Sequence, residues 1–292
     1  MMMDFERLTQ QLIEPIRQSV VSLPKATHDA IRRAMDSEDE SGRVQLDAML
    51  KAIDIGISQK IPICQDTGTP TFFVRIGTGF PGFSEIHKLE PALRKAVQIA
   101  TREIPLRPNT VHPFNGSNPG DNTGFHIPHI VWEICGDDSC DITYLPKGGG
   151  CTNMSQLTMM TPGKGIKGVK ELVLERIATM AGKPCPPTVV GVGLGGSAVM
   201  CMELAKKALL RPVGVRHSEP EVAALEKELL DKANQLGVGP MGIGGVTTVL
   251  DIKIEYEYRH PASFPVGITV QCWANRRVKM TVRPDGSVEV HP

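Results

Sequence analysis

Apolar residues recur at helical spacing through the first sixty residues of the chain. Over residues 4–21 they occupy every third or fourth position, and a second such run follows Pro24. Ser41 is placed to cap a third helix, whose apolar side includes Val44 and Leu50. The pattern predicts an all-helical N-terminal part at residues 1–60.

From residue 61 onward the pattern alternates between short apolar runs typical of strands and longer helical periods. The predicted strands are 71–76, 127–134, 141–145, 188–194 and several after residue 246, and the predicted helices are 85–103, 167–181, 198–210 and 219–236. Asp285-Gly286 marks a hairpin turn near the end. The sequence therefore predicts a mixed α/β fold, with an α/β region with mixed sheets at residues 61–292.

Composition and charge exclude several classes of partner. The 292 residues carry 32 basic and 32 acidic side chains, so no net field draws the chain toward nucleic acid or an anionic membrane. No apolar run approaches the roughly 20 residues that span a bilayer, and the N-terminus lacks the apolar core of a signal peptide. We expect a cytoplasmic protein with no nucleic-acid or membrane partner.

The segment GVGLGGS has the glycine spacing of a dinucleotide-binding turn, with Gly191, Gly193 and Gly196 between a predicted strand and a predicted helix. The acidic residue that such a site needs about 20 residues later is missing, because Arg216 and His217 stand in that region. A structural turn or a carboxylate site is favoured, and a nucleotide-binding oxidoreductase stays as an alternative.

Seven cysteines, an odd number spread from position 64 to 272, do not form the pattern of a small disulfide scaffold. Cys135 and Cys140 flank a predicted hairpin turn, Cys151 follows three glycines, and Cys201 falls inside a predicted helix, so packing is the favoured explanation for these four. The other three share a context of turns and strand ends, in ICQDTG, KPCPPT and VQCWANR. The residues alone leave open whether these three converge.

With five motifs in view, the chain resembles the α subunit of the class I, iron-sulfur-dependent fumarate hydratases in their two-subunit form. The motifs are ICQDTG at 63–68, KGGGCT at 147–152, CPP at 185–187, RHPAS at 259–263 and CWANRR at 272–277. The related L-tartrate dehydratases share most of them. The resemblance implies that Cys64, Cys185 and Cys272 hold a 4Fe-4S cluster with one iron free of protein ligands, which can act as a Lewis acid.

The resemblance also implies a reaction and its residues. The reaction is the reversible hydration of fumarate to L-malate, a step of the tricarboxylic acid cycle, with L-tartrate to oxaloacetate as the alternative. Implied as catalytic are Asp66 and His260, and as substrate-binding Gln65, Arg107, Lys147, Gly148, Gly149 and Gly150. Without the resemblance, Asp66 is better explained as the acceptor of an Asx-turn, Arg107 as a solvated charge and His260 as a loop residue. Cys151 is left outside the cluster.

Single-chain relatives continue beyond the CWANRR region, so the resemblance implies a separate β subunit in a hetero-oligomer such as α2β2. In the family that part supplies a catalytic threonine and further basic residues. The stretch 236–255 is closer to the fumarase pattern, which favours fumarate as substrate. A non-catalytic metal scaffold subunit is a further alternative. Residues 1–60 and 61–292 are expected to form one catalytic domain.

Overall fold

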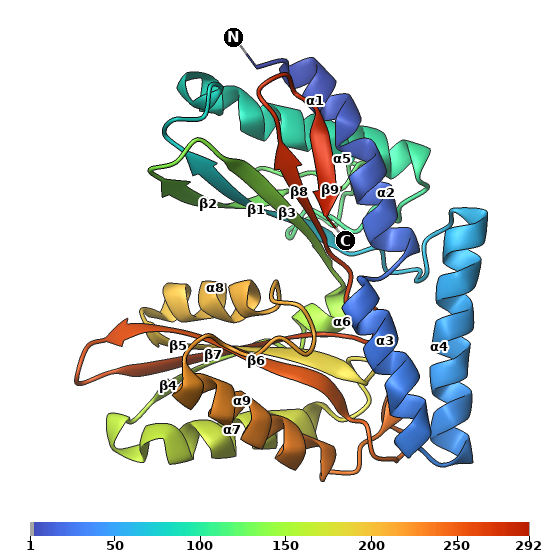
Figure 1. The fold of residues 1–292 in the computed structure, drawn as a ribbon, viewed down its shortest axis with the longest axis vertical. Helices are drawn as coiled ribbons and strands as arrows, with labels where there is room; N and C mark the ends of the chain where they lie inside the picture. The colour runs from blue at the N-terminus through green and yellow to red at the C-terminus, as the bar shows by residue number, and fades with distance from the viewer. Residues whose placement is uncertain (1–2, 292) are drawn as a thin grey trace. The chain divides into compact units, whose positions relative to one another are not determined.

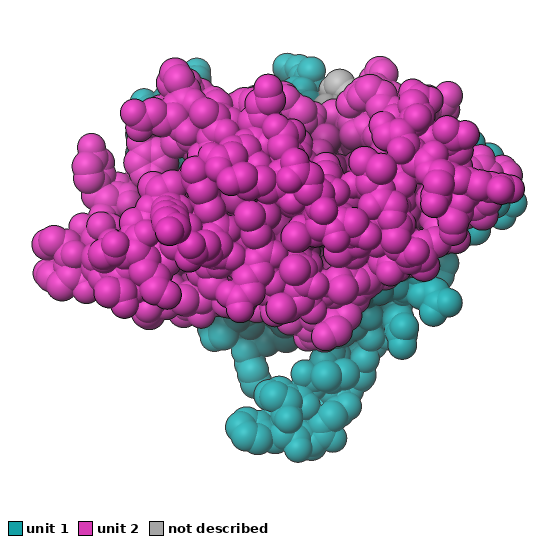
Figure 2. All heavy atoms as spheres, turned by 90° about the horizontal axis from the view of Figure 1, so that it is seen from below, with its two compact units in different colours: residues 1–24, 52–149, 276–292 teal, residues 25–51, 150–275 magenta. Residues whose placement is uncertain are grey.

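A computed structural model describes residues 3–291, which form two compact units. Unit 1 comprises Met1–Pro24, Ala52–Gly149 and Arg276–Pro292, and unit 2 comprises Lys25–Lys51 and Gly150–Asn275 (Figure 2). The chain therefore passes between the units four times. Two of these passages fall inside the motifs KGGGCT and CWANRR.

The predicted helical N-terminal part is confirmed. Its helices are α1 (Phe5–Gln11), α2 (Ile13–Val21), α3 (Lys25–Ala34) and α4 (Glu40–Gln59), with a short 3-10 turn at Met35–Ser37 (Figure 1). The predicted Ser41 cap is wrong, because α4 already begins at Glu40. Asp39 takes that role, and its Oδ1 accepts a hydrogen bond from the Gly42 amide at 2.8 Å.

Unit 1 is built on a five-stranded sheet in the order β2-β1-β3-β8-β9. Its strands are β1 (Thr69–Gly77), β2 (His129–Cys135), β3 (Cys140–Lys147), β8 (Val278–Val282) and β9 (Val288–His291). Helices α1, α2 and α5 (Leu89–Glu103), the last preceded by the 3-10 segment Phe83–Lys88, pack together over this sheet (Figure 1). Leu8, Phe72, Ala96 and Ile142 are fully buried in the resulting core.

The predicted hairpin between Cys135 and Cys140 is wrong, because β1 lies between β2 and β3. Strand β1 pairs in parallel with β2 and antiparallel with β3. The turn between the two cysteines therefore crosses the end of β1, where the Gly79 amide donates to the Asp137 carbonyl at 2.9 Å. The second predicted hairpin, β8-β9, is confirmed, and Gly286 takes the positive φ of its turn.

Unit 2 is built on a four-stranded sheet in the order β4-β7-β5-β6. Its strands are β4 (Gln156–Met160), β5 (Thr188–Gly196), β6 (Val249–Arg259) and β7 (Phe264–Gln271). Helix α8 (Ala198–Ala208) covers one face, and α7 (Gly165–Met180) and α9 (Pro220–Asn234) cover the other (Figure 1). Strand β4 and the one-turn helix α6 (Gly149–Thr152) were not predicted, and 3-10 turns lie at Pro162–Lys164 and Pro240–Gly242.

The glycines of GVGLGGS let α8 lie directly on the sheet. A Cβ added to Gly193 would stand 1.9 Å from the Cys201 carbonyl oxygen, and one added to Gly191 would stand 2.1 Å from that of Ala205. Gly267 on the neighbouring strand β7 meets the same Cys201 carbonyl at 2.6 Å. Close packing of backbone on backbone therefore accounts for this motif.

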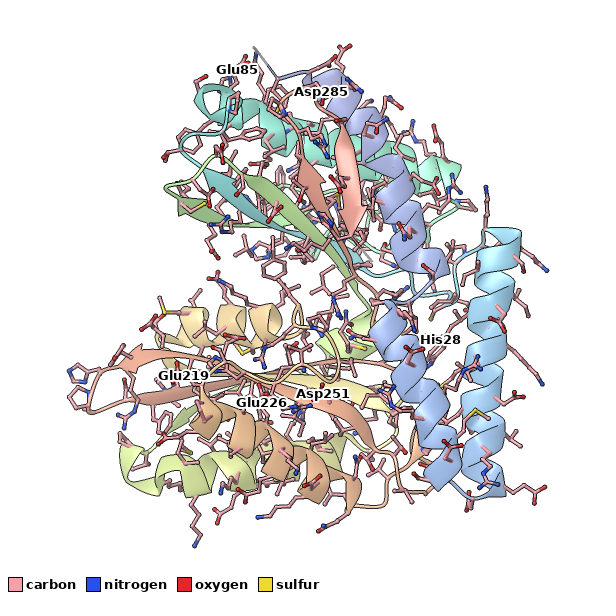
Figure 3. All side chains as sticks on the ribbon, in the orientation of Figure 1. His28, Glu85, Glu219, Glu226, Asp251 and Asp285 are labelled. Carbon is pink, nitrogen blue, oxygen red and sulfur yellow. The ribbon has the colours of Figure 1, made fainter. Side chains whose placement is uncertain are left out.

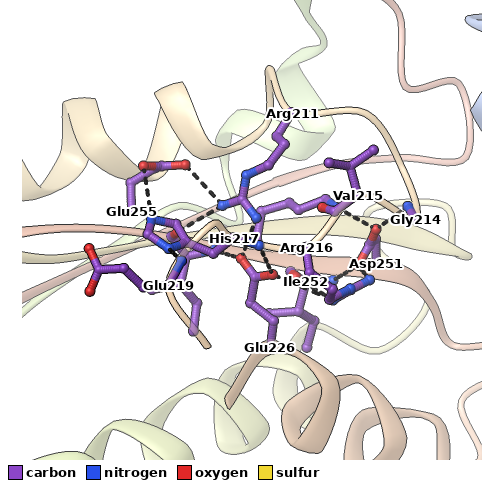
Figure 4. Close-up of polar contacts among 12 residues, drawn as sticks. Arg211, Gly214, Val215, Arg216, His217, Glu219, Glu226, Asp251, Ile252 and Glu255 are labelled. Atoms are coloured by element: carbon purple, nitrogen blue, oxygen red, sulfur yellow. Dashed lines mark hydrogen bonds and ion pairs between the residues drawn. The ribbon is translucent and has the colours of Figure 1, made fainter. Parts of the chain in front are cut away.

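The basic residues that follow α8 belong to a buried charge network in unit 2 (Figure 4). Arg211 donates to Glu226 at 2.7 Å and to Glu255 at 2.9 Å. Asp251 pairs with Lys253 at 2.7 Å and with Arg216. Glu226 on α9 and Asp251 on β6, both labelled in Figure 3, are fully buried. Because each buried carboxylate has cationic partners, the network fastens the connection between α8 and α9 onto the sheet.

Candidate functional site

Strand register brings two of the motif loops to one end of the unit 1 sheet. Strand β1 begins at Thr69, directly after the aspartate loop (residues 62–68), and β3 ends at Lys147, directly before the glycine loop (residues 148–150). The antiparallel pairing sets Thr69 opposite Lys147. The two loops therefore meet, as the motif-based prediction requires.

The carboxylate of Asp66 is held by three donors. Its Oδ1 accepts from the Gly68 amide at 3.0 Å and from Asn109 Nδ2 at 3.3 Å, and its Oδ2 accepts from the Gly149 amide at 2.7 Å. A Cβ added to Gly148 would stand 3.0 Å from the same Oδ2. The Asx-turn is thus present, and the same side chain also ties the aspartate loop to the glycine loop. Such anchoring fixes the direction of the carboxylate.

The segment that carries Arg107 is fastened beside Asp66. The Arg107 carbonyl accepts from Thr67 Oγ1 at 3.3 Å and from Asn122 Nδ2 at 3.0 Å. Asn122 Oδ1 accepts from the Asn109 amide at 2.6 Å. Asn122 is 2% exposed, and its backbone is in the left-handed region with a φ of 59°. Its buried side chain therefore fixes the segment that carries Arg107 and Asn109.

Two predicted substrate-binding side chains are available to a ligand. The side chains of Arg107 and Gln65 are exposed, and neither has a hydrogen-bond or ion-pair partner among residues 3–291. Lys147, by contrast, is buried at the end of β3. The Gly149 amide, predicted to face a substrate carboxylate, donates instead to Asp66.

Sequence reasoning missed Asn109 and Asn122. Asn109 follows Arg107 by two residues, and Asn122 stands in the turn-forming run GDNTG. Their polar side chains in otherwise ordinary turns were the available signal, but no pattern in the sequence says that one side chain reaches across to Asp66.

In unit 2, Cys185 and Cys272 belong to adjoining loops. Cys185 precedes β5 and Cys272 follows β7, and the antiparallel register sets Val189 opposite Gln271. The Trp273 amide donates to the Cys185 carbonyl at 3.2 Å. Cys185 has a φ of 54° between two prolines, a conformation that costs free energy for any residue except glycine. Gly150 lies near this loop as well, because a Cβ added there would meet the Lys183 carbonyl at 3.9 Å.

His260 does not join these cysteines within unit 2. It is an exposed residue of the β6-β7 turn, where its Nδ1 accepts from the Ala262 amide at 3.1 Å. Strand β7 separates it from Cys272, and the eight residues Phe264–Gln271 span about 23 Å. His260 and Cys272 therefore lie at opposite ends of β7, and the catalytic role of His260 stays a prediction.

The four cysteines that were not predicted as ligands are Cys135, Cys140, Cys151 and Cys201. Each is either packed in the interior or lies in surroundings that disfavour a thiolate. All seven cysteines are free, and Cys140, Cys151 and Cys201 are buried. Burial raises the pKa of Cys140 to about 12 and also raises the pKa of Cys201. Cys135 is the half-buried last residue of β2, where desolvation and its hydrogen bond to Asp137 raise its pKa.

The three cysteines predicted as ligands are half-buried and come from both units, Cys64 from unit 1 and the other two from unit 2. Among residues 3–291, no three His, Cys, Asp or Glu side chains are grouped so as to hold a metal ion. Two of the three cysteines are nonetheless linked through the backbone, because the amide of Trp273, the residue after Cys272, donates a hydrogen bond to the Cys185 carbonyl. Thiolates are the ligands that iron-sulfur clusters use.

A run of buried polar side chains follows Cys272. Asn275 is fully buried and Arg276 is 2% exposed. Both polar atoms of the Asn275 side chain, Nε and Nη1 of Arg276, and Nη1 of Arg277 have no hydrogen-bond partner among the described residues. Burial lowers the pKa of Arg277 to about 10. Unpaired buried groups of this kind suit an anionic ligand.

Across residues 3–291, no helix has the length and apolar character needed to cross a membrane.

The fold and its loops place the chain among mixed α/β proteins that carry polar site residues on loops at the ends of two sheets. The chain belongs to the fumarate hydratase (Fumerase) family, whose sequence model matches residues 9–281. This confirms the resemblance drawn from the motifs.

Named relatives align along nearly the whole chain. A Methanocaldococcus jannaschii protein, provisionally named L(+)-tartrate dehydratase subunit alpha, is 44% identical over 287 residues, which cover 97% of this chain and 100% of that protein. The L(+)-tartrate dehydratase subunit alpha of Escherichia coli K12 is 38% identical over 273 residues, 91% of this chain and 88% of that protein. The protein of the same name from Shigella boydii aligns to the same extent.

Proposed function

We propose that this chain is the α subunit of an iron-sulfur hydro-lyase that interconverts fumarate and L-malate together with a separate β subunit. Family membership and relatives named as alpha subunits support the class. The observation that carries the proposal is the anchored Asp66 carboxylate beside Arg107 and Gln65, whose side chains have no partner among residues 3–291. A fixed proton carrier next to free donors is what a dianionic hydroxy acid requires.

The proposed cluster ligands are Cys64, Cys185 and Cys272. Their half-buried thiols fit the group better than the buried thiols of Cys140, Cys151 and Cys201 do, and the unpaired donors at residues 275–277 suit its negative charge. When bound, a 4Fe-4S cluster with one iron free of protein ligands supplies a Lewis acid.

The chain's own residues have separate tasks in this proposal. Asp66 holds or releases a proton at the carboxylate oxygen, in a direction set by the Gly68 and Gly149 amides. Arg107 binds one substrate carboxylate through its forked guanidinium, and Gln65 donates to the other end. Lys147, Gly148 and Gly150 complete the substrate side, and His260, at the far end of β7 from Cys272, stays a predicted catalytic residue.

A second candidate is L-tartrate to oxaloacetate, because the relatives described above carry that activity in their names. The stretch at residues 236–255 supports fumarate, and the family model carries the name fumarate hydratase. Both reactions remove or add water on a four-carbon diacid, so the same residues of this chain would serve either one.

The test is anaerobic co-purification with the β subunit, a count of iron and sulfide, and assays with L-malate and L-tartrate. We expect about four irons per α subunit, with turnover of L-malate exceeding that of L-tartrate. Asp66→Asn should lower kcat by at least about 100-fold while iron content stays, and Asp138→Asn, an exposed carboxylate of the same unit, should change neither. A colourless, iron-free complex would refute the cluster, and faster turnover of L-tartrate would reverse the choice of substrate.

A further inference from the structure

The buried polar run at residues 275–277 has no counter-charge in this chain. Neither Arg276 nor Arg277 forms an ion pair with a carboxylate among residues 3–291. Among residues 3–291, nine buried side-chain nitrogen or oxygen atoms lack a hydrogen-bond partner, and five of them belong to Asn275, Arg276 and Arg277. A buried guanidinium without a partner is costly, and proteins keep one when an anion completes it.

Arg276 lies at the end of the unit 1 sheet that carries the aspartate and glycine loops. Strand β8 begins at Val278, which pairs with Tyr144 on β3. Arg276 precedes that pair by two residues and is close enough to Tyr144 to interact with it electrostatically. Arg276 therefore enters β8 at the end of the sheet where β3 finishes at Lys147.

The surplus of positive charge at this end calls for an anion. Arg276 and Arg277 carry positive charge here, whereas Asp66 is the single acidic residue of the aspartate and glycine loops. Asp66 already accepts three hydrogen bonds. A bound anion would supply the negative charge that the two arginines lack within the described residues.

We propose that Arg276 and Arg277, with Asn275, are the charge-compensating donors for the thiolate-ligated cluster rather than for the exchanging substrate. Arg276 is 2% exposed, so its partner is a resident group and not one that enters from solvent at each turnover. Arg276 also follows the proposed ligand Cys272 by four residues, which limits their separation to about 14 Å. The inference rests on the proposed function.

The test compares Arg276→Met, Arg276→Lys and the control Arg102→Met, at an exposed position of α5, in the complex with the β subunit, each with and without cluster. Loss of an uncompensated buried charge should raise the Tm of the cluster-free Arg276→Met protein by about 2 °C or more. The same variant should lose iron and sulfide about tenfold faster during anaerobic gel filtration against a chelator. Arg276→Lys, which keeps the charge, should retain the cluster better, and Arg102→Met should behave as wild type.

Three results would overturn the proposal. A fall in the Tm of the cluster-free Arg276→Met protein with normal iron retention would show a structural arginine. Normal iron retention with only a raised KM for L-malate would assign Arg276 to the substrate carboxylate. A wild-type complex without iron would refute the proposed function itself, whereas equal iron in wild type and variant would refute this inference alone.

Discussion

Gly193→Ala tests whether GVGLGGS is a packing motif. In the structure a Cβ added to Gly193 would stand 1.9 Å from the Cys201 carbonyl oxygen and 2.6 Å from the Ala205 amide nitrogen, where ordinary contact begins at 3.4 Å. Both atoms are helix backbone, so no side-chain rotation relieves the overlap. Helix α8 would have to move outward by about 1.5 Å.

The expected cost follows from the size of that displacement. Overpacking of a core typically costs about 1–3 kcal/mol, and occasionally more. Because α8 also rests on Gly267 of β7, its movement disturbs two strands at once, and we expect about 3 kcal/mol for Gly193→Ala.

Urea unfolding can report on unit 2 alone. The chain has two tryptophans, Trp132 in unit 1 and Trp273 in unit 2. A Trp132→Phe background leaves Trp273 as the fluorescent probe. Gly163→Ala is the matched control, since an added Cβ there meets no atom within 4 Å, and it should change stability by less than about 0.5 kcal/mol. If Gly193→Ala were as stable as this control, the packing explanation would fail.

Two further predictions follow from buried groups of unit 1. Asn122→Ala should cost about 2–3 kcal/mol, because the Asn109 backbone amide loses its partner and the Arg107 carbonyl loses one of its two donors. The variant should also lower malate turnover of the complex. Exposed Asn115→Ala is the control, and equal stability of the two variants would contradict the assignment. For Cys140, burial raises the pKa from 9.0 to about 12. The unfolded chain therefore loses this proton first, and stability declines as pH rises from 9 toward 12. Between pH 8 and pH 10, wild type should lose about 1.4 kcal/mol more than Cys140→Val in urea unfolding, and parallel losses would disprove the shift.

Periodicity was sufficient to predict most elements, because helices such as α5 and α9 and strands such as β5 and β7 have long apolar patterns. Strand β4 and helix α6 escaped because they are short, with five and four residues. The hairpin at Cys135 failed for a different reason: the apolar pattern identifies strands but does not say that β1 inserts between two strands that are neighbours in sequence.

The site was predictable in its motifs and not in its internal contacts. The motifs pointed to Asp66, and the structure adds the clamp from Gly149 and Asn109, which depends on strand register. His260 and Cys272 belong to neighbouring motifs in the sequence, yet a strand of eight residues keeps them apart. Sequence separation does not reveal such distances, because a strand extends about 3.3 Å per residue in a direction that only the fold determines.

The passage of the chain through the two units sets an order for its completion during synthesis. Unit 2 is complete once residue 275 has been made, whereas unit 1, which contains the first residues of the chain, still lacks β8 and β9. Until those strands arrive, β3 is an edge strand with open hydrogen-bonding groups. The unit that starts first on the ribosome is thus the last to close, and a chain ending at residue 275 would present β3 to other nascent chains while its other half is already folded.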